Sequence, residues 1–222
     1  MSIVLVVAPH PDDETLGCGG ALVRHKLNGD TLHWVIMTTI TIESGYTQGQ
    51  IDDRKRVISK VAKAYGFESV FQAGFATTTL DDVPIKSLIE YVSTVFNKVK
   101  PDTVYLPFNG DVHTDHRYVF DAVSACVKPF RYPFIRSVLA YQTLSETGYN
   151  LQPEKTGFNP NVWVDISDSL EQKINIMRMY SGEMGKHPFP RSEESLRAQA
   201  ILEGARAGRH FAEGFILLQE IR

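Results

Sequence analysis

The turn that follows the first hydrophobic run constrains this chain more than any other feature. Residues 3–8, IVLVVA, form an uninterrupted β-branched and apolar run, which is typical of a strand buried on both faces of a parallel sheet. The run ends at Pro9, and one imidazole and three carboxylates follow in the segment His10 to Glu14, HPDDE. Three carboxylates side by side in a partly dry crevice need a cation or shared protons. We therefore interpret this cluster as a metal site at the carboxyl end of a first strand.

Strand-like and helix-like patterns alternate along the chain after this turn. Strands are expected at residues 3–8, 31–38, 69–73, 103–106 and 138–142, and helices at 16–27, 52–65, 84–99 and 118–128. This order predicts an α/β fold, a parallel sheet with helices on both faces. Residues 161–166 and 215–221 are expected to be extended, and residues 170–180 and 193–207 helical. The length of 222 residues is most economically one domain.

A second polar cluster follows the fourth predicted strand and contains His113 and His116. Because ligands bind at the carboxyl ends of strands in open α/β sheets, we expect both clusters to meet at one edge. Two imidazoles and one carboxylate with an open position describe a catalytic zinc site. The expected ligands are His10, Asp13 and His116, which would hold one Zn²⁺ ion per chain, with Fe²⁺ as an alternative metal.

The remaining polar groups of the two clusters can then be assigned roles. Asp12 is expected to act as general base on the zinc-bound water, whose pKa the metal lowers to about 7. His113 could stabilise the oxyanion of the tetrahedral intermediate. Asp115 fits as an acceptor that orients a histidine or as a helix cap. Glu14 can satisfy backbone N–H groups at the start of the first helix. Either cluster alone has a simpler explanation, an acidic helix start or surface histidines, but both at strand ends of one sheet favour a site.

Composition excludes several classes of function. The net charge of −3 gives no electrostatic case for binding nucleic acid or an anionic membrane. No stretch approaches the ~20 apolar residues of a membrane span. Cys18 and Cys126 are interpreted as buried thiols rather than a disulfide. We therefore expect a cytoplasmic protein.

The segment from Pro9 to Gly20, PHPDDETLGCGG, together with residues 113–116, HTDH, resembles the LmbE-like family of metal-dependent deacetylases. The same family is known from the PIG-L enzyme, which deacetylates N-acetylglucosaminyl phosphatidylinositol. Weaker likeness around residues 54, 145–147, 165–167 and 197–215 extends the resemblance over nearly the whole chain. It implies a Rossmann-like three-layer α/β/α fold with a mostly parallel sheet. It also implies a single deacetylase domain over residues 1–222, with the part from about 143 contributing loops and helices to the substrate pocket.

The resemblance implies the same metal ligands, base and oxyanion donor that the residues indicate. It adds Arg54, which corresponds in the family to a basic residue that reaches substrate. Many members have a glutamate at the position that aligns with Gln142, so substrate contacts there are expected to differ.

Two loops, residues 39–50 and 181–192, are expected to determine the substrate. In the second loop, His187, Arg191 and Ser192 are candidates for recognising a phosphate, nucleotide or carboxylate on a larger sugar conjugate. The alternative is a loop that packs against a neighbouring subunit, so a homo-oligomer remains open.

Together these interpretations predict a hydrolase of carbohydrate metabolism that removes the N-acetyl group from a small amino sugar or sugar conjugate. Two alternatives come from other classes. The same two histidines and carboxylate could hold Fe(II) in an oxygenase, and a metal-dependent sugar-binding module would lack turnover.

Overall fold

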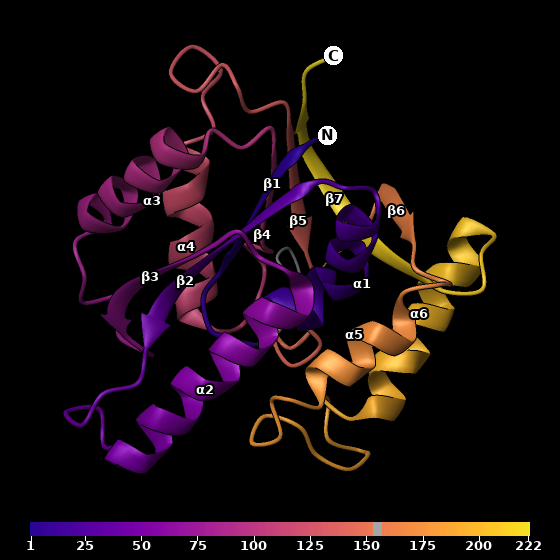
Figure 1. The fold of residues 1–222 in the computed structure, drawn as a ribbon, viewed down its shortest axis with the longest axis horizontal. Coiled ribbons are helices and arrows are strands. Elements are labelled where there is room, and N and C mark those ends of the chain that lie inside the picture. The colour runs from indigo at the N-terminus through magenta and orange to yellow at the C-terminus, as the bar shows by residue number, and fades with distance from the viewer. Residues whose placement is uncertain (153–156) are drawn as a thin grey trace.

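One seven-stranded sheet forms the centre of the computed structural model, which describes residues 1–152 and 157–222. Its strands are β1 (Ile3–Ala8), β2 (Thr31–Thr39), β3 (Ser69–Ala76), β4 (Thr103–Pro107), β5 (Ser137–Tyr141), β6 (Val162–Asp165) and β7 (Ala212–Glu220). They lie in the order β3-β2-β1-β4-β5-β7-β6 (Figure 1). Strands β1 to β5 are mutually parallel, whereas β7 runs antiparallel to β5 and β6 on either side of it. The predicted mostly parallel sheet is confirmed.

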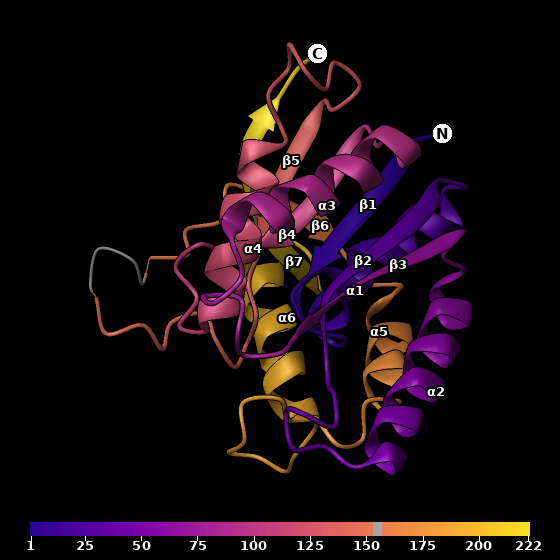
Figure 2. The same ribbon diagram turned by 90° about the vertical axis from the view of Figure 1, so that its left-hand side faces the viewer.

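Helices cover both faces of this sheet (Figure 2). They are α1 (Asp13–Leu27), α2 (Gln48–Tyr65), α3 (Ile85–Val99), α4 (Thr114–Ala125), α5 (Leu170–Met177) and α6 (Glu193–Ala207). One buried cluster joins α1, α2, α5 and α6 to the sheet, and a second joins α3 and α4 to the opposite face. This is the three-layer α/β/α arrangement that the sequence predicted. None of the described helices has both the length and the apolar character needed to cross a bilayer.

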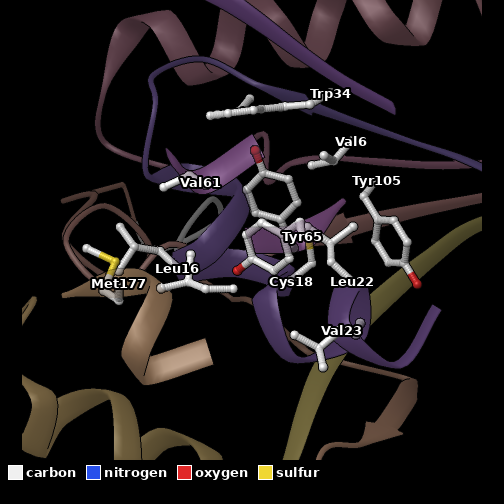
Figure 3. Close-up of a cluster of buried hydrophobic side chains, with 14 of the residues drawn as sticks. Val6, Leu16, Cys18, Leu22, Val23, Trp34, Val61, Tyr65, Tyr105 and Met177 are labelled. Atoms are coloured by element: carbon white, nitrogen blue, oxygen red, sulfur yellow. The ribbon is translucent and has the colours of Figure 1, made fainter. Parts of the chain in front are cut away.

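The first strand is buried on both faces, as its sequence predicted. Val4 and Val6 face the layer that contains α1, while Leu5 and Val7 face the layer of α3 and α4. Figure 3 shows the first of these layers, where Trp34 lies among aliphatic and aromatic side chains from several elements.

Three helices begin three or four residues earlier than predicted. Helix α2 begins at Gln48 because Thr47 and Gln50 form a capping box. Helix α4 begins at Thr114, capped by the imidazole of His113, and imidazole is outside the usual set of capping side chains. Helix α1 begins at Asp13, directly after the acidic turn. The two polar clusters therefore lie at the starts of α1 and α4.

The strand order places β1 and β4 side by side at the centre of the sheet. From β1 the chain continues to β2 and β3 on one side of the sheet, whereas from β4 it continues to β5 on the other side. This reversal is a topological switch point, where open α/β sheets bind ligands beyond the carboxyl ends of the strands. The turn after β1 and the loop after β4 both open there.

Candidate active site

The structure brings the three predicted metal ligands together at the switch point. One carboxylate oxygen of Asp13, Oδ2, lies 3.3 Å from Nδ1 of His10 and 3.3 Å from Nε2 of His116. The donor atoms of the three residues all lie within 4.8 Å of one another. His116 and Asp13 are buried, and His10 is partly exposed. Two ring nitrogens and one carboxylate therefore converge on one point.

The orientation of the His10 ring is fixed by Asp115. Nε2 of His10 lies 3.0 Å from Oδ2 of Asp115. The Asp115 carboxylate is held in turn by the backbone N–H groups of Thr78, at 2.8 Å, and Leu80, at 3.2 Å. Because Nε2 is occupied, Nδ1 is the nitrogen of His10 that faces Asp13 and remains free to ligate.

Asp111 orients the second histidine in the same way. Its Oδ2 lies 2.8 Å from Nδ1 of His116, which leaves Nε2 facing Asp13. The other oxygen of Asp111 accepts a hydrogen bond of 2.5 Å from the Thr147 hydroxyl. Asp111 was not among the predicted site residues. The pairing of each histidine with a buried carboxylate is the usual arrangement around ligating imidazoles.

The charge balance of this cluster suits a divalent cation. Burial raises the pKa of Asp13, but His116 and His10 outweigh it, so that pKa lies well below its usual value. Burial lowers the pKa of His10, yet hydrogen bonds to Asp115 and Asp13 outweigh it and raise that pKa to about 9. Metal binding requires neutral imidazoles, and Asp13, Asp111 and Asp115 then leave negative charge that a metal ion compensates. The donor set therefore fits a metal ion on chemical grounds.

Asp12 is held in a strained backbone conformation beside the ligands. Its φ of 137° lies in a region that residues other than glycine rarely adopt, which is a feature of functional sites. Its N–H donates to the carboxylate of Glu14 at 3.1 Å. Its buried side chain has one side-chain partner among the described residues, Arg191, at 3.5 Å. Burial and the neighbouring Asp13 raise the pKa of Asp12 well above its usual value. The carboxylate is thus left available for proton transfer.

Glu14 stabilises this turn from within the core. It is fully buried, and besides the N–H of Asp12 it accepts hydrogen bonds from the hydroxyls of Thr15 and Tyr180, at 2.6 and 2.8 Å. Burial raises its pKa to about 7. Glu14 therefore satisfies a backbone N–H at the start of the first helix, as expected.

His113 presents a hydrogen-bond donor to the site. Its Nδ1 accepts the backbone N–H of Asp115 at 3.1 Å, so the ring hydrogen lies on Nε2. Burial, together with His10 and His116, lowers the pKa of His113 to about 4, which keeps the ring neutral at pH 7. Its ring centroid lies 4.6 Å from that of His10. A neutral imidazole with a free N–H therefore lies beside the ligand cluster.

Two of the predicted substrate contacts, Arg54 and Arg191, are joined to each other by Glu183, which the sequence did not single out. Arg54 donates to Oε1 of Glu183 at 2.7 Å, and Arg191 lies 3.3 Å from the other oxygen of Glu183. Arg191 also reaches Asp12. This chain of charges connects α2, the segment after α5 and the acidic turn after β1.

The other two predicted contacts lie apart from this network. His187 is exposed and precedes Pro188, to which it is joined by a cis peptide bond. Ser192 is buried and caps α6 by accepting the N–H of Ser195 at 3.1 Å. Within residues 1–152 and 157–222, no hydrogen bond or ion pair joins either side chain to the ligand cluster.

A buried ion pair between Lys173 and Glu213 supports α1, the helix that follows the acidic turn. Helix α1 bends at Cys18, where the backbone leaves the helical conformation. Glu213 accepts the N–H of Gly20 at 2.9 Å and that of the following residue, just beyond the bend. Lys173 donates to Glu213 at 2.7 Å and to the carbonyl of Leu16, just before the bend, at 2.9 Å. The pair thus satisfies backbone groups that the bend frees on both sides.

Tyr141 holds the N-terminal part of α1 against the sheet. A Cβ atom at Gly17 would lie 2.1 Å from the Tyr141 ring, so only glycine fits there. The Tyr141 hydroxyl donates to the carbonyl of Val7 at 3.0 Å. The end of β1 and the start of α1 are therefore held by one side chain from β5.

The sequence profile of the family described as GlcNAc-PI de-N-acetylase (PIG-L) matches residues 5–127, which include both polar clusters. The chain belongs to the PIG-L family. The resemblance predicted from the PHPDDE and HTDH segments is thereby confirmed.

Relatives of this PIG-L family member are similar over most of its length. A diacetylchitobiose deacetylase from Thermococcus kodakarensis is 26% identical over 227 residues, which cover 95% of this chain and 81% of the relative. A conserved protein from Thermus thermophilus superposes with a TM-score of 0.79 and 25% identity, covering 100% of this chain and 97% of that one. The N,N'-diacetylchitobiose deacetylase from Pyrococcus horikoshii, at 23% identity and a TM-score of 0.76, covers 97% and 83% and shares the fold.

Proposed function

We propose that this PIG-L family member is a metal-dependent hydrolase that removes the N-acetyl group from an amino sugar or sugar conjugate. One observation carries the proposal. The outer nitrogens of His10 and His116 are each held by a buried aspartate, so that both inner nitrogens face Asp13. Asp12 lies next in sequence to Asp13 with a carboxylate that is nearly free of partners. The deacetylase activity in the name of the Thermococcus kodakarensis relative supports the same reaction.

We infer that the metal is Zn²⁺, because two imidazoles and one carboxylate with an open position are typical of catalytic zinc. A bound Zn²⁺ ion would lower the pKa of a coordinated water towards ~7 and polarise the amide carbonyl. The same two histidines and aspartate can also bind Fe(II). A carboxylate base beside the ligands favours hydrolysis over oxygen chemistry.

Asp12 has the placement of a general base. It takes a proton from the attacking water as the new C–O bond forms. The C–N bond of the acetamide then breaks, and Asp12 returns the proton to the leaving nitrogen. Acetate and a free amine are the products, so every proton that Asp12 takes up is returned. Arg191, at 3.5 Å, keeps the Asp12 side chain beside the site between these steps.

His113 acts on the oxyanion that develops on the acetyl carbonyl. Because Nδ1 accepts the N–H of Asp115, the donor is Nε2–H of a neutral ring. A donor fixed in this way needs no reorganisation when charge develops, which is the basis of oxyanion stabilisation.

The test measures the acetate and the free amine that metal-free and zinc-loaded protein release. The protein is stripped with a chelator, reloaded with Zn²⁺ and incubated with N-acetylglucosamine, N,N'-diacetylchitobiose and N-acetylglucosamine 1-phosphate. We expect equal amounts of acetate and free amine, and only after reloading. Zinc-loaded protein that releases no acetate from any of the three compounds would refute the proposal, as would oxygen consumption by iron-loaded protein without acetate.

A further inference from the structure

The two histidines of the ligand cluster are held by two different kinds of support. Asp115, which orients His10, accepts hydrogen bonds from two backbone N–H groups. Asp111, which orients His116, is held by a side chain, the hydroxyl of Thr147, at 2.5 Å. A backbone N–H is present in every residue except proline, whereas a hydroxyl is lost by a single substitution. The support of His116 therefore depends on one identifiable side chain beyond its own aspartate.

The direction of each hydrogen bond from Thr147 to His116 follows from its partners. Oγ1 of Thr147 accepts the N–H of Thr143 at 2.8 Å, so its own O–H is free to donate. The Asp111 carboxylate can only accept, and its Oδ1 receives this O–H at a length typical of a charge-assisted bond. Its Oδ2 receives the Nδ1–H of His116 at 2.8 Å. The lone pair of Nε2 is then the one that faces Asp13.

The Thr147 hydroxyl is held in place by a turn that follows β5. The N–H groups of Glu146 and Thr147 both donate to the carbonyl of Thr143, at 2.9 and 2.7 Å. Thr143 is buried, and it is bound to Thr147 through the backbone and through the side chain. The hydroxyl therefore reaches Asp111 from a turn that is already formed.

The same segment also holds the backbone of the loop after β4. The carbonyl of Glu146 accepts the N–H of Val112 at 3.2 Å, and the side chain of Asn150 donates to the carbonyl of Gly110 at 3.2 Å. These contacts lie on either side of Asp111 and do not involve the hydroxyl that holds its side chain. Removing that hydroxyl should therefore leave the loop in place and affect the carboxylate alone.

The Asp111 carboxylate is fully buried, which makes the loss of a partner costly. Without the Thr147 hydroxyl, Oδ1 would be a buried acceptor with its hydrogen bond unmade. The carboxylate would relieve this cost by turning towards another donor. Such a turn moves Oδ2 away from Nδ1 of His116 and releases the imidazole ring.

We propose that Thr147 is a positioning residue of the metal site, which acts through Asp111 to hold His116 in the orientation that presents Nε2 to the ion. The inference rests on the proposed metal-dependent function and extends the support of its ligands to the segment after β5. It predicts that the affinity for the metal depends on a hydroxyl that lies two residues away from the ion along the chain of hydrogen bonds.

The experiment measures zinc dissociation constants by competition with a chromogenic chelator. Thr147→Val keeps the shape of the side chain without the hydroxyl and should raise the dissociation constant roughly three- to tenfold. Thr147→Ala removes the same hydroxyl and should show the same loss, whereas Thr147→Ser keeps it and should bind zinc like the wild type. The matched control is Thr94→Val in α3, an exposed threonine whose hydroxyl bonds a helix carbonyl. This variant should also resemble the wild type.

A double-mutant cycle separates positioning through Asp111 from a general effect on the fold. In an Asp111→Ala background, Thr147→Val should weaken zinc binding no further, because the connection to His116 is already broken. Wild-type zinc affinity in Thr147→Val and Thr147→Ala would overturn the inference. So would an equal loss in both backgrounds, since Thr147 would then act by another route.

The zinc measurement needs no substrate and is therefore independent of turnover. Zinc-loaded wild-type protein that releases no acetate would refute the proposed hydrolysis and leave the role of Thr147 standing. Acetate release together with unchanged zinc affinity in the Thr147 variants would do the reverse.

Discussion

Oδ2 of Asp111 lies 2.8 Å from Nδ1 of His116, and both side chains are buried. This contact selects the nitrogen of His116 that faces Asp13. The two residues lie five positions apart, at the loop after β4 and in the first turn of α4. Asp111 therefore acts on the ligand cluster through His116.

Replacing Asp111 by alanine should weaken metal binding by about 10- to 100-fold, because the His116 ring loses its orienting acceptor. Competition against a chromogenic chelator measures this affinity directly. The control is Asp121→Ala, which replaces an exposed aspartate of α4, the helix that contains His116. This variant should bind zinc like the wild type. Unchanged affinity in a folded Asp111→Ala protein would contradict the role of Asp111.

His113→Asn should separate the two proposed functions of His113, which are to cap α4 and to stabilise the oxyanion. Asparagine is a good N-cap, so the thermal midpoint should change little, whereas the Nε2–H donor is lost. We expect kcat to fall by about 10²- to 10³-fold, the usual loss for one oxyanion donor. A His113→Asn enzyme with the wild-type kcat would show that the oxyanion is stabilised elsewhere.

Breaking the buried ion pair between Lys173 and Glu213, which supports α1, should destabilise the fold strongly. Lys173→Met leaves the Glu213 carboxylate buried without its ammonium partner, and about 3–5 kcal/mol of unfolding free energy should be lost. Urea unfolding measures the change. Lys86→Met removes an exposed pair with Glu90 and serves as control, with no measurable shift of the midpoint. Equal midpoints for the two variants would mean that the buried pair contributes little.

Gly17→Ala should destabilise the protein, because its Cβ would overlap the ring of Tyr141 at 2.1 Å. Overpacking of this kind costs about 1–3 kcal/mol. The matched variant is Gly49→Ala in α2, where the nearest side-chain atom lies 3.9 Å away and alanine favours the helix. Differential scanning calorimetry should show a lower Tm for Gly17→Ala and an equal or higher Tm for Gly49→Ala. The opposite order would contradict the close contact.

Local sequence patterns were sufficient for the sheet and for the residues that meet at its edge. The predicted bounds of β1 and of the helix over residues 193–207 agree with the structure, whereas Ser192, predicted to contact the substrate, is the cap of that helix. Helix α4 begins before its predicted start because an imidazole, an uncommon cap, ends the loop, and α2 does so because the Thr47–Gln50 capping box extends it.

The roles of Glu183 and Glu213, whose carboxylates support the site, could not be predicted from local sequence patterns. Glu183 lies outside every motif, and Glu213 lies in the 197–215 stretch of weaker family likeness without an assigned role; each lies more than a hundred residues from a partner in α1 or α2. Their roles depend on which segments pack together. Sequence patterns therefore predicted the three residues that the structure brings together, whereas the residues that hold them in place required the tertiary structure.

The most direct test of the proposed hydrolysis is the turnover of zinc-loaded Asp12→Asn. Asparagine tolerates positive φ better than most residues, so the turn should keep its conformation and its metal. We predict zinc affinity equal to that of the wild type and a loss of about 10²- to 10⁴-fold in kcat for acetate release. Acetate release at the wild-type rate by an Asp12→Asn protein with bound zinc would contradict the assignment of Asp12 as the base.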